Sequence, residues 1–306
     1  MTRSFTFLVN PASGGGAAPG AVVPVARLLR EAGATVDVTY SPGPRAMPGL
    51  VAAAVGRGDV VVSVGGDGML SSLAGEVSAA GGTLAVLPAG RGNDFARMLG
   101  LPESPEDLAA LLLSGPARRV DLLCASFPGH PPREVAGSVY CGIDARAAAL
   151  VDRAHRLPRR LQYPLAAVGA LLTYAPAGYR LCVDDDVREL EAATVVVANS
   201  AYYGKGMRIA PPASVTDGLL DVVVIEAASK AALVRALPKV YDGGHVDLPE
   251  VTVLSGRRVE LAADPARSGG SPVPVGGDGE PLGLLPGLAD DPLVVEVRPG
   301  AVAVVC

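Results

Sequence analysis

A run of β-forming residues that ends in glycines and an acid constrains this chain more than any other segment. Residues 60–64 read VVVSV and lead directly into Gly65-Gly66-Asp67-Gly68. Valine favours strands, while glycine leaves backbone N–H groups accessible and a carboxylate follows at the strand's end. The pattern predicts an α/β sheet that binds a nucleotide at this point, although glycines beside an acid also form ordinary turns.

Strand and helix patterns alternate through the first third of the chain. We expect strands at residues 4–10, 34–40, 60–64 and 83–87, with helices at 20–31, 50–56 and 70–80. Such alternation is typical of a parallel sheet covered by helices on both faces. Ligands bind beyond the carboxyl ends of parallel strands, where this chain has polar, mostly glycine-containing loops at 10–16, 41–45, 65–68 and 88–94.

The pattern changes after residue 119. Short apolar runs separated by Gly, Pro and Asp predict a second, mainly antiparallel β domain, with helical segments at 145–156 and 161–174 and a mobile loop at 267–274. We therefore expect an α/β domain over residues 1–125 and a β-sandwich domain over 126–306, whose extreme C-terminus returns to the first domain. A second GGDG stands at 276–279 but continues into Glu280-Pro281 rather than a helix.

Charge and cysteine usage exclude several functions. The 306 residues carry a formal net charge of −5, which argues against nucleic-acid binding. The four cysteines show no CxxC spacing and the three histidines are scattered, so the sequence suggests neither a disulfide framework nor a zinc site. Reduced thiols are typical of the cytoplasm, where we expect the protein to reside. A basic island at Arg153, Arg156, Arg159 and Arg160 is either a solvated helix end or a contact for an anionic membrane.

Five short segments occur in an order that resembles the diacylglycerol-kinase-like lipid kinase family, which includes soluble bacterial lipid kinases and the sphingosine and ceramide kinases. They are Asn10-Pro11-Ala12-Ser13-Gly14, the GGDG at 65–68, residues 88–96 (PAGRGNDFA), Asp217-Gly218-Leu219-Leu220-Asp221 and Asp278-Gly279-Glu280. The resemblance spans essentially the whole chain. It implies that ATP and Mg²⁺ bind between the α/β domain and the β-sandwich domain, with the active site in the cleft.

The resemblance also implies which residues contact the nucleotide. They are Asn10, Ser41, Gly65, Gly66, Asp67, Gly68, Met69, Gly90, Arg91, Asn93, Asp94 and Glu280. Asn93 or Asp94 is expected to cap the following helix, whose N-terminus favours phosphate. Arg91 and Met69 depart from the threonines common in the family, so Arg91 either grips phosphate or points to solvent, and contacts at Met69 must come from its backbone.

Asp278 matches the family's general base, which takes the proton from the lipid hydroxyl and orients it for transfer. Asp217, with the carbonyls of Ser214 and Leu219, resembles a structural Mg²⁺ loop, although an Asp-Gly turn fits equally well. Asp121 takes the place of an acid that joins Glu280 in a water and Mg²⁺ network.

The resemblance predicts an ATP- and Mg²⁺-dependent lipid kinase acting on diacylglycerol or a related lipid, in peripheral contact with a membrane. An NAD-kinase-like enzyme would share GGDG but gives Asp278 and Glu280 no evident role. A catalytically silent nucleotide or lipid sensor is the other alternative, and homodimerisation stays open.

Overall fold

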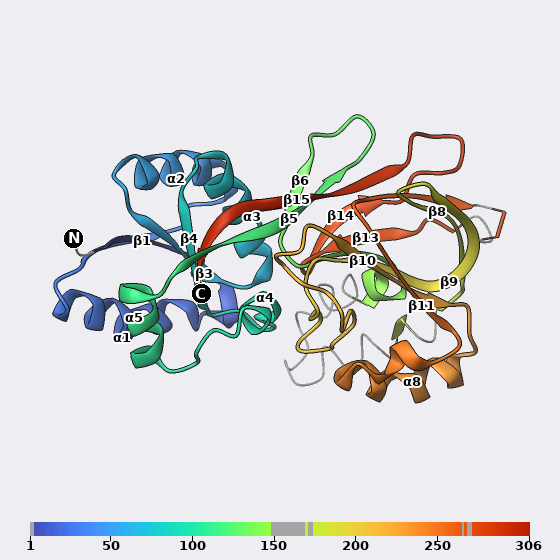
Figure 1. Ribbon diagram of the computed structural model, residues 1–306, viewed down its shortest axis with the longest axis horizontal. Helices are drawn as coiled ribbons and strands as arrows, with labels where there is room; N and C mark the ends of the chain where they lie inside the picture. The colour runs from blue at the N-terminus through green and yellow to red at the C-terminus, as the bar shows by residue number, and fades with distance from the viewer. Residues whose placement is uncertain (1–2, 148–168, 171–173, 265, 268–270) are drawn as a thin grey trace.

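The computed structural model describes the chain except residues 1–2, 148–168, 171–173, 265 and 268–270. It divides into two lobes joined by long strands (Figure 1). The first lobe contains β1 (Ser4–Val9), α1 (Ala18–Glu31), β2 (Thr35–Tyr40), α2 (Met47–Gly56), β3 (Val60–Gly65), α3 (Asp67–Ala79), β4 (Thr83–Pro88), α4 (Asp94–Met98) and α5 (Pro105–Ser114). Short 3-10 turns lie at Ser13–Gly15 and Pro44–Ala46.

The first-lobe sheet has parallel strands in the order β2-β1-β3-β4. Side chains alternate between its two faces because a strand's residues point in opposite directions in turn. Phe7 and Val62 face α1 and α5, whereas Leu8 and Val61 face α2 and α3. The sheet is thus buried on both sides, and only its strand ends are available to a ligand.

Two long strands connect the lobes. β5 (Ala117–Ser126) pairs antiparallel with β15 (Leu293–Val305) along most of its length, and the last residues of β15 pair parallel with β4. The register shifts between Arg298 and Val302, where the chain passes from one lobe to the other. The C-terminal strand therefore completes the first-lobe sheet.

The second lobe is a β-sandwich. Its remaining elements are β6 (Arg133–Val135), β7 (Ser138–Gly142), β8 (Ala177–Val183), β9 (Asp186–Ala198), β10 (Leu220–Glu226), α8 (Lys230–Asp242), β11 (Val251–Gly256), β12 (Arg258–Asp264), β13 (Pro274–Gly277) and β14 (Glu280–Leu284), with a 3-10 turn at Gly244–Asp247. The first half of β9 pairs with β8 and its second half with β7 and β10. Valine and leucine side chains from these strands fill the core of the sandwich.

The predicted fold class, an α/β domain followed by an antiparallel β-sandwich, is confirmed. Two helices were not predicted: α5, which Ser104 caps, and α8, which Ser229 caps and Gly243 ends in a left-handed conformation. Most of the helical segments expected at 145–174, and with them the basic island, lie outside the described residues, as does part of the 267–274 loop.

Candidate active site

Three glycine-rich loops meet at the carboxyl edge of the parallel sheet. A Cβ atom on Gly90 would lie 2.4 Å from the Cα atom of Gly66, and one on Gly14 would lie 2.4 Å from the carbonyl oxygen of Ala89. The backbones of all three loops therefore touch, which only glycine permits at these points. A small hollow at this edge is lined by Ser63, Gly65, Gly66, Asp67, Leu70, Val86, Pro88, Asn93 and Ala96.

Asp67 joins two of these loops. It begins α3, and its Oδ1 accepts a hydrogen bond of 3.1 Å from the backbone N–H of Phe95 in the first turn of α4. Asn93 holds the N-cap position of this helix, but the expected side-chain cap is absent, and Asp67 supplies the acceptor from another strand's end. Asn93 instead adopts a left-handed conformation, with φ of 54°, and its Oδ1 accepts from the N–H of Gly90 at 2.8 Å.

Acidic neighbours surround Asp67. Burial raises the pKa of its carboxyl to about 6, and the negative charges of Asp278 and Asp94 add to the rise. The Phe95 N–H opposes it without cancelling it. Such crowding of carboxylates is relieved by a proton or by a nearby cation.

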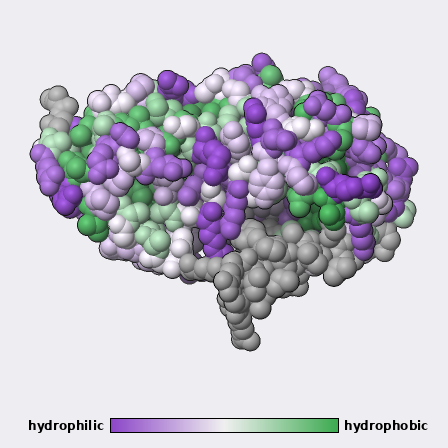
Figure 2. All heavy atoms as spheres, turned by 90° about the horizontal axis from the view of Figure 1, so that it is seen from below, coloured by the Kyte–Doolittle hydropathy of each residue, from purple (hydrophilic) through white to green (hydrophobic). Residues whose placement is uncertain are grey.

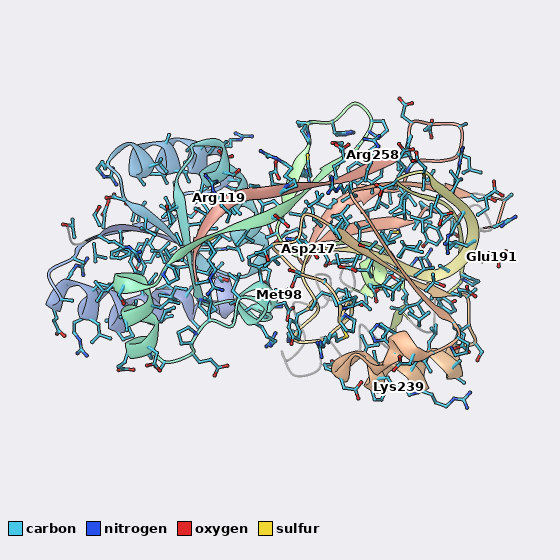
Figure 3. The ribbon with its side chains drawn as sticks, viewed as in Figure 1. Met98, Arg119, Glu191, Asp217, Lys239 and Arg258 are labelled. Carbon is cyan, nitrogen blue, oxygen red and sulfur yellow. The ribbon has the colours of Figure 1, made fainter. Side chains whose placement is uncertain are left out.

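Asp94 connects the two lobes. Its carboxylate accepts hydrogen bonds from the backbone N–H groups of Lys205 and Gly206, at 2.8 and 2.6 Å, and from Arg97 at 2.6 Å. Met98, at the end of the same helix, packs against the hydrophobic cores of both lobes and lies at their junction in Figure 3. The loop after β4 is thereby fixed relative to the β-sandwich.

Asp278 lies at the tip of the β13–β14 hairpin in a left-handed conformation, with φ of 46°. Its carboxylate accepts hydrogen bonds from three successive backbone N–H groups, those of Ala136, Gly137 and Ser138, at 2.9–3.0 Å, and from the hydroxyl of Ser71 on α3. Burial raises the pKa of this carboxyl, although the four donors oppose the rise. The donors come from both lobes, so Asp278 is held at their interface.

Glu280, on the same hairpin, contacts the first GGDG loop. A Cβ atom on Gly68 would lie 2.9 Å from Glu280 Oε1, so the two residues are in contact. Tyr140 also contacts the hairpin, since its hydroxyl accepts a hydrogen bond from the N–H of Gly279 at 3.2 Å. The structure therefore gathers Asp67, Gly68, Asp278 and Glu280 at one place.

Asp121 forms hydrogen bonds to the loop at residues 214–219, which resembles a structural Mg²⁺ loop. Its buried carboxylate accepts from the N–H groups of Gly218 and Gly300, at 2.8 and 2.6 Å. Asp217 is exposed, and its Oδ1 accepts from the N–H of Leu219 at 3.0 Å, while the Ser214 hydroxyl lies 3.3 Å from that of Thr216. Metal binding by Asp217, Ser214, Leu219 and Asp121 stays a prediction. Within the described chain, no group of three or more His, Cys, Asp or Glu side chains is arranged to hold a metal ion.

The other predicted nucleotide residues lie on loops that follow the strands and, in the case of Met69, in the first turn of α3. Asn10 Oδ1 accepts from the N–H of Ala12 at 3.1 Å, and the Ser41 hydroxyl accepts from the N–H of Gly43 at 3.3 Å. Met69 lies against Gly65, whose Cβ would come within 3.0 Å of its sulfur atom, and Arg91 is exposed on the loop after β4.

Sequence reasoning missed Ser71, Tyr140 and Lys205. Ser71 had a signal, since it follows Asp67 by four residues and so lies on the same face of α3. Tyr140 and Lys205 come from separate parts of the second lobe, and nothing in their local sequence indicates that the fold brings them to this site.

Two observations concern the distribution of apolar residues in the molecule. In the view of Figure 2, hydrophilic side chains gather over the middle of the face, between hydrophobic areas toward its two ends. In the described ranges, no helix combines the length and apolar character that crossing a membrane requires.

The fold and the gathered residues define a two-domain kinase. Residues 4–125 match the family model named diacylglycerol kinase catalytic domain, and residues 137–306 match the one named YegS C-terminal NAD kinase beta sandwich-like domain. The chain belongs to the diacylglycerol kinase family of lipid kinases.

Similar proteins agree with this membership. The chain is 33% identical over 264 residues to the diacylglycerol kinase of Mycobacterium tuberculosis, covering 84% of each protein. It is 25% identical over 247 residues to that of Bacillus subtilis, covering 77% of this chain and 75% of the relative. A crystal structure of a diacylglycerol kinase from Bacillus anthracis has the same fold, with a TM-score of 0.68, 17% identity and coverage of 99% of this chain and 97% of that one.

Proposed function

We propose that this enzyme transfers the γ-phosphoryl group of ATP, with Mg²⁺, to a hydroxyl of diacylglycerol or a related lipid at a membrane surface. The observation that carries the proposal is the position of Asp278, held by donors from both lobes beside the acid-bearing GGDG loop. An acceptor for the lipid hydroxyl and a binding loop for phosphate thus lie on either side of one site.

The hydrogen bonds of Asp278 indicate where the substrate hydroxyl would bind. Oδ2 already accepts from Ser71, Ala136 and Gly137, whereas Ser138 is the one donor to Oδ1 among the described residues. Because a carboxylate has about four acceptor sites divided between two oxygens, Oδ1 has room for another donor. We infer that the lipid hydroxyl donates to Oδ1, which orients its oxygen toward the γ-phosphorus and later takes its proton.

The glycine loops would bind the triphosphate. The N–H groups of residues 66–68 lie at the start of α3, where the helix dipole favours negative charge. Asp67 and Glu280 fit Mg²⁺, since both are carboxylates beside this loop and Asp67 is destabilised by its acidic neighbours. The metal would neutralise charge on the phosphates.

An NAD-kinase-like reaction is the alternative that the comparisons leave open, because the name of the second-domain family includes NAD kinase. Incubation with Mg²⁺, γ-labelled ATP and either diacylglycerol in mixed micelles or NAD separates the two. Label in a chloroform-soluble phospholipid supports the proposal. Label in NADP, with none in lipid, would contradict it.

A further inference from the structure

The helix α8 has a stripe of exposed apolar side chains. Val234, Leu237 and Tyr241 are 52%, 46% and 55% exposed, and their spacing of three and four residues puts them on one side of the helix. Eight large hydrophobic side chains of the described chain are exposed, and three of them lie on this one helix. Single exposed apolar residues are ordinary, whereas a group of neighbours marks an interaction surface.

This apolar stripe is not needed to hold α8 in place, because another side of the helix is buried. Val240 is 6% exposed and packs with Ile209 and Val223 in a core cluster of the second lobe. Its carbonyl oxygen also accepts a hydrogen bond of 2.8 Å from the N–H of Arg208. The helix is therefore fixed to the β-sandwich, and its exposed side is available to a partner.

Cations lie on the exposed surface of the same helix. Arg235 and Lys239, which are four residues apart, are both exposed. Arg235 donates to the carbonyl oxygen of Ala231 in its own helix, at 3.1 Å, and within the described ranges neither cation forms an ion pair. The sequence of α8 has three cations against one acid, Asp242, whereas the whole chain has a net charge of −5. The helix thus presents a positive, partly apolar surface on an acidic protein.

This combination fits an anionic membrane better than a second copy of the chain. Lysine and arginine stems lie along an apolar boundary while their charges reach lipid phosphates. A symmetric contact between two copies would bring two positive helices together, which like charges disfavour. Figure 2 views the molecule from the side on which α8 lies in Figure 1, and hydrophobic side chains gather near the second-lobe end of that face.

We propose that α8 docks on an anionic membrane, with its apolar stripe entering the headgroup boundary and its cations Arg235 and Lys239 binding lipid phosphates. The choice of a membrane rests on the proposed function, because a diacylglycerol substrate lies in a bilayer.

One short segment connects α8 to the candidate active site. The N–H of Arg208 binds the carbonyl oxygen of Val240 on α8, and the N–H groups of Lys205 and Gly206 bind the Asp94 carboxylate in the first lobe. A membrane-bound α8 would therefore keep the junction of the two lobes near the lipid surface.

The substitution Val234→Asp tests the apolar stripe, and Val187→Asp is its matched control. Both valines are 52% exposed and both lie in the second lobe. Val187 is close to the β8–β9 turn, where Asp184 accepts from the N–H of Arg258. In Figure 3, Arg258 and the α8 residue Lys239 lie at opposite edges of that lobe, so the control adds the same charge away from α8.

Sedimentation of the full chain with vesicles of phosphatidylglycerol and phosphatidylcholine, without nucleotide, measures docking, and the melting temperature checks the fold. We expect Val234→Asp to bind roughly 10-fold or more weakly and Val187→Asp to stay within a few fold of wild type. Replacing Arg235 and Lys239 together with glutamine should weaken binding by about 30-fold. Binding of wild type should rise with phosphatidylglycerol content and fall with salt.

Three outcomes would overturn the inference. The first is wild type that does not sediment with these vesicles, or Val234→Asp that sediments as well as wild type. The second is an equal loss in Val234→Asp and Val187→Asp, which would indicate added charge and not the loss of a docking helix. The third is a wild-type dimer that Val234→Asp converts to a monomer in analytical ultracentrifugation with vesicle binding unchanged, which would assign the stripe to a second copy.

A kinase assay in mixed micelles separates this inference from the proposed function. Wild type that labels diacylglycerol in micelles but does not sediment with vesicles would contradict docking alone. Wild type that sediments through α8 but transfers no label from ATP to diacylglycerol would contradict the proposed function, while the docking surface would stand.

Discussion

The substitution Asp67→Asn should stabilise the protein without ligands while it removes the proposed metal ligand. In the folded chain the Asp67 carboxyl has a pKa of about 6, against an ordinary value of 3.8. Ionising it therefore costs the folded state more than the unfolded state, by about 3 kcal/mol at 1.36 kcal/mol per pKa unit. Asparagine carries no charge and still offers an oxygen to the N–H of Phe95.

The size of this effect depends on pH. Below about pH 4 aspartate is protonated in both states, so the two proteins should be equally stable. As the pH rises through the unfolded pKa toward 6, wild type loses stability relative to the variant, and above 6 the difference is constant.

Thermal unfolding followed by differential scanning fluorimetry at pH 4, 6 and 8 measures this effect. A difference of 3 kcal/mol corresponds to about 5–10 °C at pH 8 for a chain of this size, taken as an upper bound. Added Mg²⁺ should raise the melting temperature of wild type and not that of Asp67→Asn. A variant that melts at or below wild type at pH 8 would refute the electrostatic reasoning.

Three further substitutions test neighbouring contacts. Arg91→Ala should raise the KM for ATP by roughly 10-fold or more in steady-state assays, as expected for a charge-assisted hydrogen bond, and Arg91→Thr should recover part of the loss; an unchanged KM would make Arg91 a solvated surface residue. Ser71→Ala should lower kcat up to about 10-fold with KM for ATP unchanged, because Asp278 keeps its three backbone donors. Asp121→Asn should destabilise the fold by about 1–3 kcal/mol in urea titrations, since an amide nitrogen cannot accept from Gly218 or Gly300; unchanged unfolding would show that this clamp is dispensable.

The parallel sheet and its ligand-binding edge were predictable because local patterns determine them. The sequence shows a valine run as long as a strand, strand and helix patterns that alternate, and glycine at the end of each strand. Each of these signals lies within a few neighbouring residues. The β-sandwich was predictable for the same reason, from short apolar runs between turn residues.

The features of the site that could not be predicted depend on contacts between distant segments. Asp67 caps α4 from another strand, and Asp278 is held by N–H groups about 140 residues earlier in the chain. Lys205 reaches the site only because its hairpin docks on Asp94. The α8 helix has an amphipathic sequence (KAALVRALPKVYD) with Pro238 inside it, so its sequence did carry a helical signal that was missed.

The most direct test of the central claim is the rate of phosphoryl transfer to diacylglycerol by Asp278→Asn, measured with Mg²⁺ and labelled ATP beside its affinity for Mg·ATP. Asparagine cannot take the hydroxyl proton, and a general base contributes about 10²–10⁴-fold; because its amide nitrogen would also face a backbone N–H donor, the melting temperature is measured beside the rate. We expect a loss of at least about 100-fold in rate, with nucleotide affinity within a few fold of wild type. A variant that keeps more than about a tenth of the wild-type rate, less loss than any general base would give, would show that Asp278 only tethers the hairpin.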